Sequence, residues 1–398
     1  MELTLLIFFI FVILISCLQF LNRRLLRQIL HPSCDYWITT ALIIIHSPLI
    51  LYASMRSIGI GSKAQGLQLL ARLGVSFQLL TVMLLLVWGT SNIIWLYTNK
   101  LQNKNLCTLE NNKRRRFLQK TSIMAIVLTI FCIIHGSAGA KLEPEITYHE
   151  LKFPNLPPGL DGLRIVQISD LHAGPIVQLE QVKKWRYLAE KMQPELLLIT
   201  GDIVDSLPSE AKIVAEAFSN FCAPLGCFAI LGNHDYFTNP YPIWETLSNV
   251  GIQFLENRNA LISRNGDNLA IIGLQDPMAK HKRFLKKDSA YGSGPQPTTA
   301  MRDIPKNAWR LCIIHRPSDW CLAKQTSSLL TLCGHTHGGQ VNFIPGVSSA
   351  LLLGKQYTSG LYKEGQYQLY VNRGLGVVAL PMRIAATPEI AVITLRRE

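Results

Sequence analysis

The stretch CFAILGNHDY, residues 227–236, joins a run of apolar residues to a polar cluster that suits neither a strand nor a helix. Residues 227–231 have the pattern of a buried strand, and Gly232 marks a turn directly after it. The turn accounts for the glycine and the asparagine, but it gives no reason for the His234 and Asp235 that follow. We therefore compared the ends of the other apolar runs in the chain.

Four further apolar runs, at 163–169, 195–200, 310–314 and 329–333, also end in carboxylate or imidazole side chains. The clusters that follow them are, in chain order, DLH (170–172), GD (201–202), His315 and GHTH (334–337). Each cluster alone is common on protein surfaces or in turns, so the inference rests on all five occurring in this order. Ligands of α/β sheets bind beyond the carboxyl ends of the strands. We therefore expect these side chains to meet in one cleft.

The chemistry of the collected side chains limits what the cleft can bind. Besides Asp235, the clusters hold two aspartates, one asparagine and five histidines and no cysteine, which disfavours thiolate metals and structural zinc. Imidazole with carboxylate suits Zn, Fe, Mn or Co, and so many groups suit two ions about 3.5–4 Å apart. We expect Asp170 and His172, two apart on an extended stretch, to point the same way. Glycines before Asp202, Asn233 and His335 would let backbone and ions approach closely.

The second part of the chain alternates apolar runs with amphipathic stretches. Strand patterns also occur at 252–256, 269–274, 367–372 and 390–395, and helical patterns at 181–192 and 241–249. Before them, the Pro-rich segment 141–160 reads as an irregular linker. These patterns predict an α/β domain over 161–398 with two packed sheets flanked by helices.

The ordered set DLH, GD, GNHD, H and GHTH resembles the calcineurin-like metallophosphoesterase superfamily, over roughly residues 160–395. The stretches GHTHGGQ (334–340), IIHRPSD (313–319) and PMRIAATPEIAVITL (381–395) are most similar to its bacterial membrane-linked phosphodiesterase branch. The resemblance implies an αββα two-sheet sandwich. It also implies two transition-metal ions, Mn, Fe or Zn, and hydrolysis of phosphodiester or phosphomonoester bonds by in-line attack of a hydroxide that bridges the ions.

The resemblance assigns a role to each residue of the clusters. The implied metal ligands are Asp170, His172 and His337 at the first ion, Asn233, His315 and His335 at the second, and Asp202 bridging both. His234 would contact the scissile phosphate and protonate the leaving oxygen, with Asp235 orienting His234. Outside these motifs, Asp205 is expected to be an exposed acid at a strand end or a partner of a ligand. Arg316 and Arg373 are candidate phosphate contacts.

The first 140 residues have the composition of a membrane region. Apolar segments near 3–21, 36–55, 73–97 and 121–138 approach or reach the length of about 20 residues that crosses a bilayer as a helix. Residues 1–140 hold 13 Lys+Arg against 3 Asp+Glu, whereas residues 141–398 hold 26 against 23. The net charge of +13 therefore belongs mainly to the membrane region and does not indicate a nucleic-acid partner.

The loops of this region predict its orientation. Segment 99–120 carries seven basic residues against one acid and should stay cytoplasmic, which leaves the C-terminal domain on the extracytoplasmic side of a bacterial inner membrane. The expected partners are a phosphate-ester substrate, of which a lipid-linked ester is one candidate, and membrane lipids. Two alternatives stay open: a cytoplasm-facing enzyme similar to UDP-2,3-diacylglucosamine diphosphatases, and a non-catalytic, metal-stabilised membrane sensor. Cys222 and Cys227 could form a disulfide or remain thiols.

Overall fold

The computed structural model describes residues 143–280, 292–342, 347–352, 354–378 and 382–398 of the 398-residue chain. The chain divides into two units, Met1–His135 and Gly136–Glu398, and all described residues belong to the second. The four predicted membrane segments lie outside the described residues. Within the described ranges, no helix combines the length and the apolar character needed to cross a bilayer.

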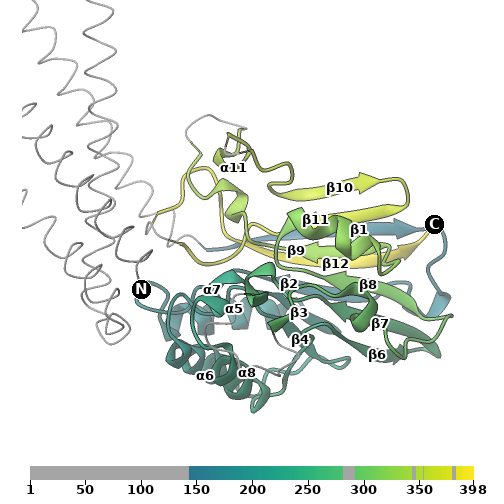
Figure 1. The fold of residues 1–398 in the computed structure, drawn as a ribbon, viewed down its shortest axis with the longest axis horizontal. Helices are drawn as coiled ribbons and strands as arrows, with labels where there is room; N and C mark the ends of the chain where they lie inside the picture. Colours follow the sequence, from purple (N-terminus) through teal and green to yellow (C-terminus); the bar gives the residue numbers. More distant parts are fainter. Residues whose placement is uncertain (1–142, 281–291, 343–346, 353, 379–381) are drawn as a thin grey trace, which may run out of the picture. The chain divides into compact units, whose positions relative to one another are not determined.

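The first sheet has the strand order β1-β12-β2-β3-β4-β5 (Figure 1). Its strands are β1 Glu145–Phe153, β12 Glu389–Arg397, β2 Arg164–Ile168, β3 Leu196–Thr200, β4 Cys227–Ile230 and β5 Ile252–Phe254. Strands β2 to β5 are parallel, so their carboxyl ends share one edge. Every residue of β3 and β4 is buried, because these strands are covered on both faces.

The second sheet has the order β10-β11-β9-β8-β7-β6. Its strands are β10 Gly360–Glu364, β11 Tyr367–Val371, β9 Leu330–Cys333, β8 Trp309–Ile313, β7 Asp267–Gly273 and β6 Arg258–Arg264. The four central strands are parallel, and β6 and β10 pair antiparallel at the two edges. The carboxyl ends of β8 and β9 therefore lie at one edge as well.

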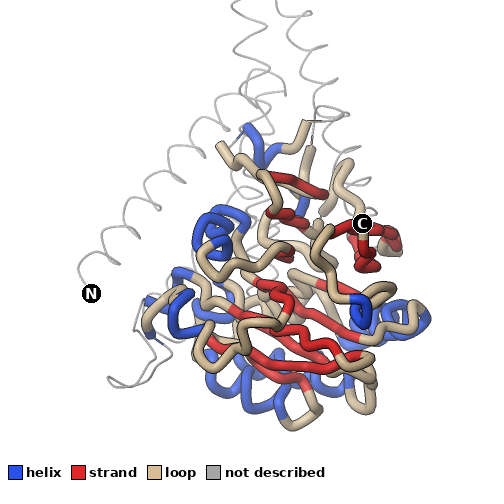
Figure 2. Tube along the Cα trace, turned by 90° about the vertical axis from the view of Figure 1, so that its right-hand side faces the viewer, coloured by secondary structure: helices blue, strands red, loops and turns tan. Residues whose placement is uncertain are grey.

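Helices lie outside the two packed sheets (Figure 2). Apolar residues of both sheets, such as Leu198 and Leu332, form one core between them. Helices α5 Leu179–Lys191, α6 Ala211–Phe218 and α8 Pro240–Ser248 pack with the outer face of the first sheet. Trp320, at the start of α10 Trp320–Lys324, packs on the outer face of the second. The predicted two-sheet α/β fold is confirmed.

Short helical turns connect these elements. They are η3 Pro158–Leu160, η4 Pro208–Glu210, α7 Asn233–Phe237, η5 Pro277–Lys280, α9 Pro297–Ala300, η7 Pro317–Asp319, η8 His337–Gly339 and α11 Ser349–Leu352. Two of them overlap the polar clusters: α7 begins at Asn233 within GNHD, and η8 begins at His337, the last residue of GHTH.

The segment predicted as an irregular linker, 141–160, contains a nine-residue strand. Residues Glu145–Phe153 form β1, which pairs in parallel with β12 from Glu145–Glu389 to Phe153–Arg397. Only residues near its end are buried: Leu151 and Phe153 pack in the core between the sheets. Three of the four prolines of this segment come after the strand, and an edge strand with polar residues has no apolar run to reveal it.

Cys222 and Cys227 are both free thiols. Cys222 is exposed, whereas Cys227 is buried at the start of β4. Burial raises the pKa of the Cys227 thiol to about 11, so this group stays protonated and packs as a small apolar side chain.

Candidate metal centre

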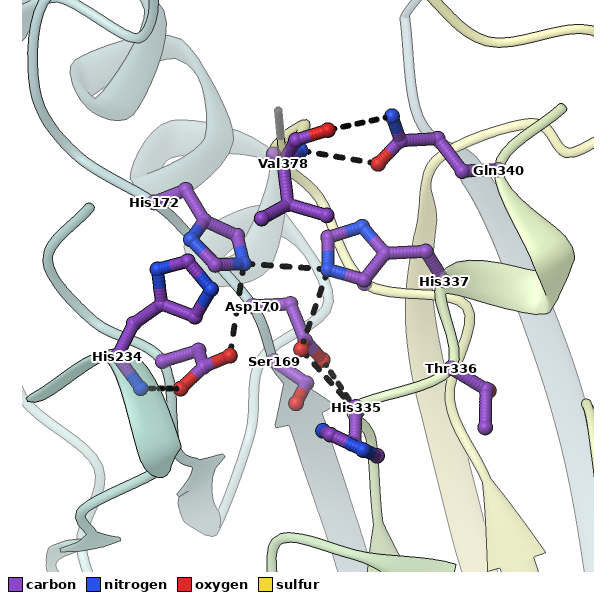
Figure 3. A network of polar contacts seen from close by, with 12 residues as sticks. Ser169, Asp170, His172, His234, His335, Thr336, His337, Gln340 and Val378 are labelled. Atoms are coloured by element: carbon purple, nitrogen blue, oxygen red, sulfur yellow. Dashed lines mark hydrogen bonds and ion pairs between the residues drawn. The ribbon is translucent and has the colours of Figure 1, made fainter. Parts of the chain in front are cut away.

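The polar clusters of both sheets meet at the carboxyl ends of their parallel strands (Figure 3). The first sheet contributes Asp170 and His172 after β2, Asp202 after β3, and Asn233 to Asp235 after β4. The second sheet contributes His315 after β8, and His335 and His337 after β9. Each residue was predicted at a strand end, and the structure brings these strand ends together.

Asp170, His172 and His337 form one buried group. One ligand atom from each lies within 4.8 Å of the others. His337 Nε2 is 3.4 Å from Asp170 Oδ1 and 3.1 Å from His172 Nε2. These three side chains are the ones predicted for the first ion.

Asp202, His315 and His335 form a second group with ligand atoms within 4.8 Å of one another. His315 Nε2 is 3.3 Å from Asp202 Oδ2 and 3.2 Å from His335 Nδ1. It is also 3.2 Å from the side-chain oxygen of Asn233. The four side chains predicted around the second ion, including the bridging aspartate, are therefore neighbours.

Asp202 lies between the two groups. Its Oδ2 is 3.3 Å from His315 Nε2 in the second group and 3.6 Å from His172 Nε2 in the first. Its other oxygen, Oδ1, accepts a hydrogen bond of 2.8 Å from the backbone N–H of His234. One oxygen of Asp202 thus faces both groups while the other fixes the turn that carries His234.

The backbone of the site differs from the extended stretch that we predicted. Asp170 and His172 have φ values of 52° and 45°, and Asp202, His335 and His337 have 51°, 75° and 52°. This left-handed region costs a non-glycine residue about 1–3 kcal/mol and is concentrated at functional sites. The turn that carries Asp170 and His172 is held by two hydrogen bonds of 3.0 Å. The backbone N–H of Asp170 donates to the carbonyl of Gly201, and that of His172 donates to the carbonyl of Asp202.

Two glycines provide the close approach that the sequence suggested. A Cβ on Gly232 would lie 2.3 Å from Asp202 Oδ1, and a Cβ on Gly334 would lie 2.2 Å from Asp170 Oδ2. Both distances are far below a van der Waals contact. The backbone can therefore pass against the two carboxylates only where a side chain is missing.

The electrostatics of the buried site set the charge of its groups. Burial lowers the pKa of His172 well below its ordinary value and that of His335 to about 3, so both imidazoles are neutral. Burial would raise the pKa of Asp202, but the neighbouring His315 lowers it well below the ordinary range. Asp202 in turn outweighs the effect of burial on His315 and raises its pKa to about 10. Neutral imidazole and ionised carboxylate are the forms that bind metals, and an ion here would displace the proton of His315.

His234 lies half-buried at the edge of the two groups. Its Nδ1 is 2.8 Å from the backbone carbonyl of Asp205, and its ring stands edge-on to that of His172 at 4.6 Å. A carbonyl oxygen can only accept, so Nδ1 carries the hydrogen. The Nε2 atom is therefore the nitrogen left to take up or release a proton.

The role predicted for Asp235, orienting the ring of His234, is wrong. Asp235 is fully buried, and its oxygens accept hydrogen bonds from the backbone N–H groups of Ile203, Val204 and Gly232. Burial raises the pKa of Asp235 to about 7. Its carboxyl thus ties the loop after β3 to the turn after β4, while the carbonyl of Asp205 orients the ring.

Asp205 itself is buried, not exposed as the sequence suggested, with 2% of its surface accessible. Its Oδ1 is 4.0 Å from His172 Nδ1. The alternative that we stated, a partner of a ligand, is the one that this placement supports. The chain turns inward at Asp205, where its N–H donates to the carbonyl of Ala173.

The two arginines named as phosphate contacts are engaged in ion pairs. Arg316 forms a two-pronged pair with Asp276 at 2.6 and 3.0 Å, and Arg373 pairs with Glu389 and Glu145 at 3.2 and 2.7 Å. Both arginines brace loops next to the site.

Arg383 is a site neighbour that the sequence analysis missed. Its guanidinium is buried, with Nη2 at 3.2 Å from His337 Nδ1 and at 3.1 Å from the carbonyl of Gly374. In the sequence, no motif spacing links Arg383 to another residue of the site. Only its position in the stretch 381–395, which resembles the superfamily, could have indicated it.

Comparisons with known proteins agree with this geometry. A family model described as calcineurin-like phosphoesterase matches residues 163–339. The metallophosphoesterase YkuE of Bacillus subtilis (strain 168) is 32% identical over 265 residues, which cover 64% of this chain and 87% of that protein. The phosphodiesterase YaeI of Escherichia coli (strain K12) is 29% identical over 295 residues, covering 71% and 98%.

A transmembrane protein with metallophosphoesterase domain from Danio rerio is 29% identical over 285 residues. The match covers 70% of this chain and 63% of the zebrafish protein, so the chain spans less than two thirds of that relative. The relatives, the matched domain and the assembled clusters agree with one another. The chain belongs to the calcineurin-like metallophosphoesterases, a superfamily of metal-dependent phosphoric ester hydrolases, as its motifs predicted.

Proposed function

We propose that the chain is a membrane-anchored phosphoesterase that uses two metal ions to hydrolyse phosphodiester or phosphomonoester bonds. The observation that carries the proposal is the position of Asp202 Oδ2, which lies 3.3 Å from one histidine group and 3.6 Å from the other. A single carboxylate oxygen between two sets of imidazoles is an arrangement that suits two adjacent cations.

The residues around Asp202 fit such a pair of ions. Nitrogen atoms of neighbouring histidines approach to 3.1 and 3.2 Å, which places several lone pairs around the same points in space. In this proposal Asp170, His172 and His337 hold the first ion. The second is held by Asn233, His315 and His335, and Asp202 touches both. The bound ions, Mn, Fe or Zn, would neutralise the phosphoryl oxygens and lower the pKa of a water.

His234 acts on the leaving group in this proposal. The carbonyl of Asp205 holds the Nδ1–H of His234, so the protonated ring presents its second hydrogen at Nε2. The backbone of His234 is fixed by Asp202, and the turn before it by Asp235. An imidazole held in this way suits proton donation to the departing oxygen. A non-catalytic sensor would have no need of this arrangement.

We further propose that residues 1–140 form about four membrane helices and that residues 161–398, completed by strand β1 of the segment 141–160, form the catalytic domain. Apolar composition supports the anchor, and related proteins of zebrafish and cattle are named for a transmembrane part. The basic segment 99–120 favours an extracytoplasmic catalytic domain. A topology reporter fused after residue 398 tests the orientation. Reporter activity on the cytoplasmic side would overturn it and favour a cytoplasm-facing pyrophosphatase.

The test of the enzymatic proposal compares the wild type with Asp202→Asn in a metal-dependent hydrolysis assay. We expect the wild type loaded with Mn²⁺ to hydrolyse bis-p-nitrophenyl phosphate or a phosphomonoester, and the variant to lose bound metal and turnover together. Asp267→Asn is the matched control, because Asp267 accepts a hydrogen bond of 2.7 Å from Gly159 and is not among the site's groups. A wild type that is inactive with every metal tested, or a fully active Asp202→Asn, would refute the proposal.

A further inference from the structure

The short helix α7, Asn233–Phe237, has two faces of different character. Asp235 and Tyr236 point into the protein, and Tyr236 donates to Glu256 there. His234 and Phe237, three residues apart, share the opposite face, as helical geometry requires. Phe237 keeps 45% of its surface accessible. Tyr236 is therefore the aromatic residue of α7 that packs in the core, and much of the Phe237 side chain makes no packing contact there.

Phe237 is placed against the proton donor of the proposed mechanism. Six large apolar side chains of the described residues are exposed, and single exposed apolar residues are ordinary on protein surfaces. Phe237 differs from the others because its ring lies 5.0 Å from the ring of His234, with 54° between the planes. The ring of His234 also lies 4.6 Å from the ring of His172, edge-on to it. His234 thus adjoins both the candidate metal groups and an exposed aromatic ring.

These two contacts of His234 indicate where a leaving group would go. The proposed reaction puts the phosphorus at the metal groups and the leaving oxygen at His234, so the rest of the leaving alcohol extends from the side of His234. Phe237 is the exposed apolar surface that adjoins His234. A leaving alcohol with an apolar portion would cover the ring and remove its surface from water, whereas a polar alcohol would gain nothing there.

We propose that Phe237 forms the wall of a leaving-group subsite, and that the enzyme favours phosphate esters whose leaving alcohol carries an aromatic ring or an alkyl or acyl chain. This inference rests on the proposed function. Phe237 acts by contact with the substrate and leaves the proton transfer to His234. Its removal therefore lowers kcat/KM for apolar leaving groups and spares polar ones.

The experiment compares the wild type with Phe237→Ala on three diesters in the presence of Mn²⁺. The diesters are bis-p-nitrophenyl phosphate, dihexyl phosphate and glycerophosphoglycerol, which carry aromatic, alkyl and polar alcohols. Both enzymes meet the same ester, so the intrinsic reactivity of each leaving group cancels in the ratio of their kcat/KM values. We expect Phe237→Ala to lose about 10-fold on one or both apolar esters and less than about 2-fold on the polar ester.

Two further variants sharpen the result. Phe237→Leu keeps an apolar wall without the ring, so it restores hydrolysis of dihexyl phosphate if chains bind there, and fails to restore the aryl ester if stacking on the ring matters. Leu261→Ala removes an exposed apolar side chain from β6 and should change none of the ratios.

The outcomes separate this inference from the proposed function. A wild type that hydrolyses none of the three esters with any metal tested removes both. A wild type that is active, with equal losses on all three esters in Phe237→Ala, overturns the subsite and shows that Phe237 serves only to hold His234. Metal content equal to that of the wild type confirms that the variant has kept its site.

Discussion

Gly334→Ala tests the closeness of the candidate metal centre with the smallest change available. Gly334 follows β9 and precedes His335. Its φ is not in the left-handed region, so alanine can adopt its backbone conformation, and the effect of the substitution is steric. The added Cβ would lie 2.0 Å from Ser169 Oγ and 2.2 Å from Asp170 Oδ2.

The size of the effect follows from these distances. A normal contact needs at least about 3 Å, so Asp170 and the turn at Gly334 must move apart by about 1 Å. Asp170 has little freedom to move, because its oxygens accept the N–H of His335 at 3.0 and 3.1 Å. Overpacking of this kind costs about 1–3 kcal/mol of stability. Ligand distances tolerate only about 0.2 Å, so we expect affinity for the first ion to fall by 10–100-fold or more.

The measurement is Mn²⁺ titration of metal-free protein by calorimetry, with elemental analysis of the loaded protein. Gly251→Ala is the control. Its Cβ would meet nothing within 4 Å, but its φ of +90° strains alanine by about 1–2 kcal/mol. The control therefore loses stability without a clash at the site and should bind metal like the wild type. If Gly334→Ala also binds Mn²⁺ with wild-type stoichiometry and affinity, Asp170 is not a ligand in the position that the structure gives it.

Three other results are expected. His234→Ala should keep its metal but lose 10²–10⁴-fold in kcat, because the proton donor is gone, and an unchanged kcat in steady-state assays would disprove the acid role. Chelation with EDTA should lower the Tm of the wild type and leave that of Asp202→Asn unchanged in differential scanning calorimetry; equal shifts would point to metal bound elsewhere. Burial raises the pKa of Glu256 from 4.5 to about 8, so the folded state retains its proton. The stability that this proton contributes is fully present below pH 4.5 and is lost as pH rises through about 8. Urea unfolding should therefore give a lower free energy of unfolding at pH 9 than at pH 5 in the wild type, and Glu256→Gln should lack this difference. Equal differences in the two proteins would contradict the assignment.

The parts of the fold that the sequence predicts best are those where burial repeats a simple pattern. The mainly apolar runs at β2, β3, β4, β8 and β9 are buried on both faces except at Arg164 and Arg310, so almost every residue reports the same environment. The edge strands β1, β6 and β10 were missed. Most residues of these strands are exposed or only partly buried, so no apolar pattern marks them. They are strands because they pair with β12, β7 and β11.

The candidate ligands were predictable because each follows directly on a buried run. What orients them was not. Asp205 looked like a surface acid from its spacing, and its burial depends on how the loop after β3 packs under the turn after β4. Asp235 was assigned to the ring of His234 from the resemblance to the superfamily. On a helical turn adjacent residues point apart, and Asp235 faces the backbone donors of the neighbouring loop.

The division of the candidate ligands between the sheets has a mechanical consequence. Asp170, Asp202 and Asn233 extend from one layer, and His315 and His337 from the other. Ions coordinated by both sets would cross-link the two sheets at the end where several residues adopt strained left-handed conformations. Loading the protein with metal should therefore slow hydrogen exchange in the strands on both sides of the joint together, well beyond the residues that touch the ions.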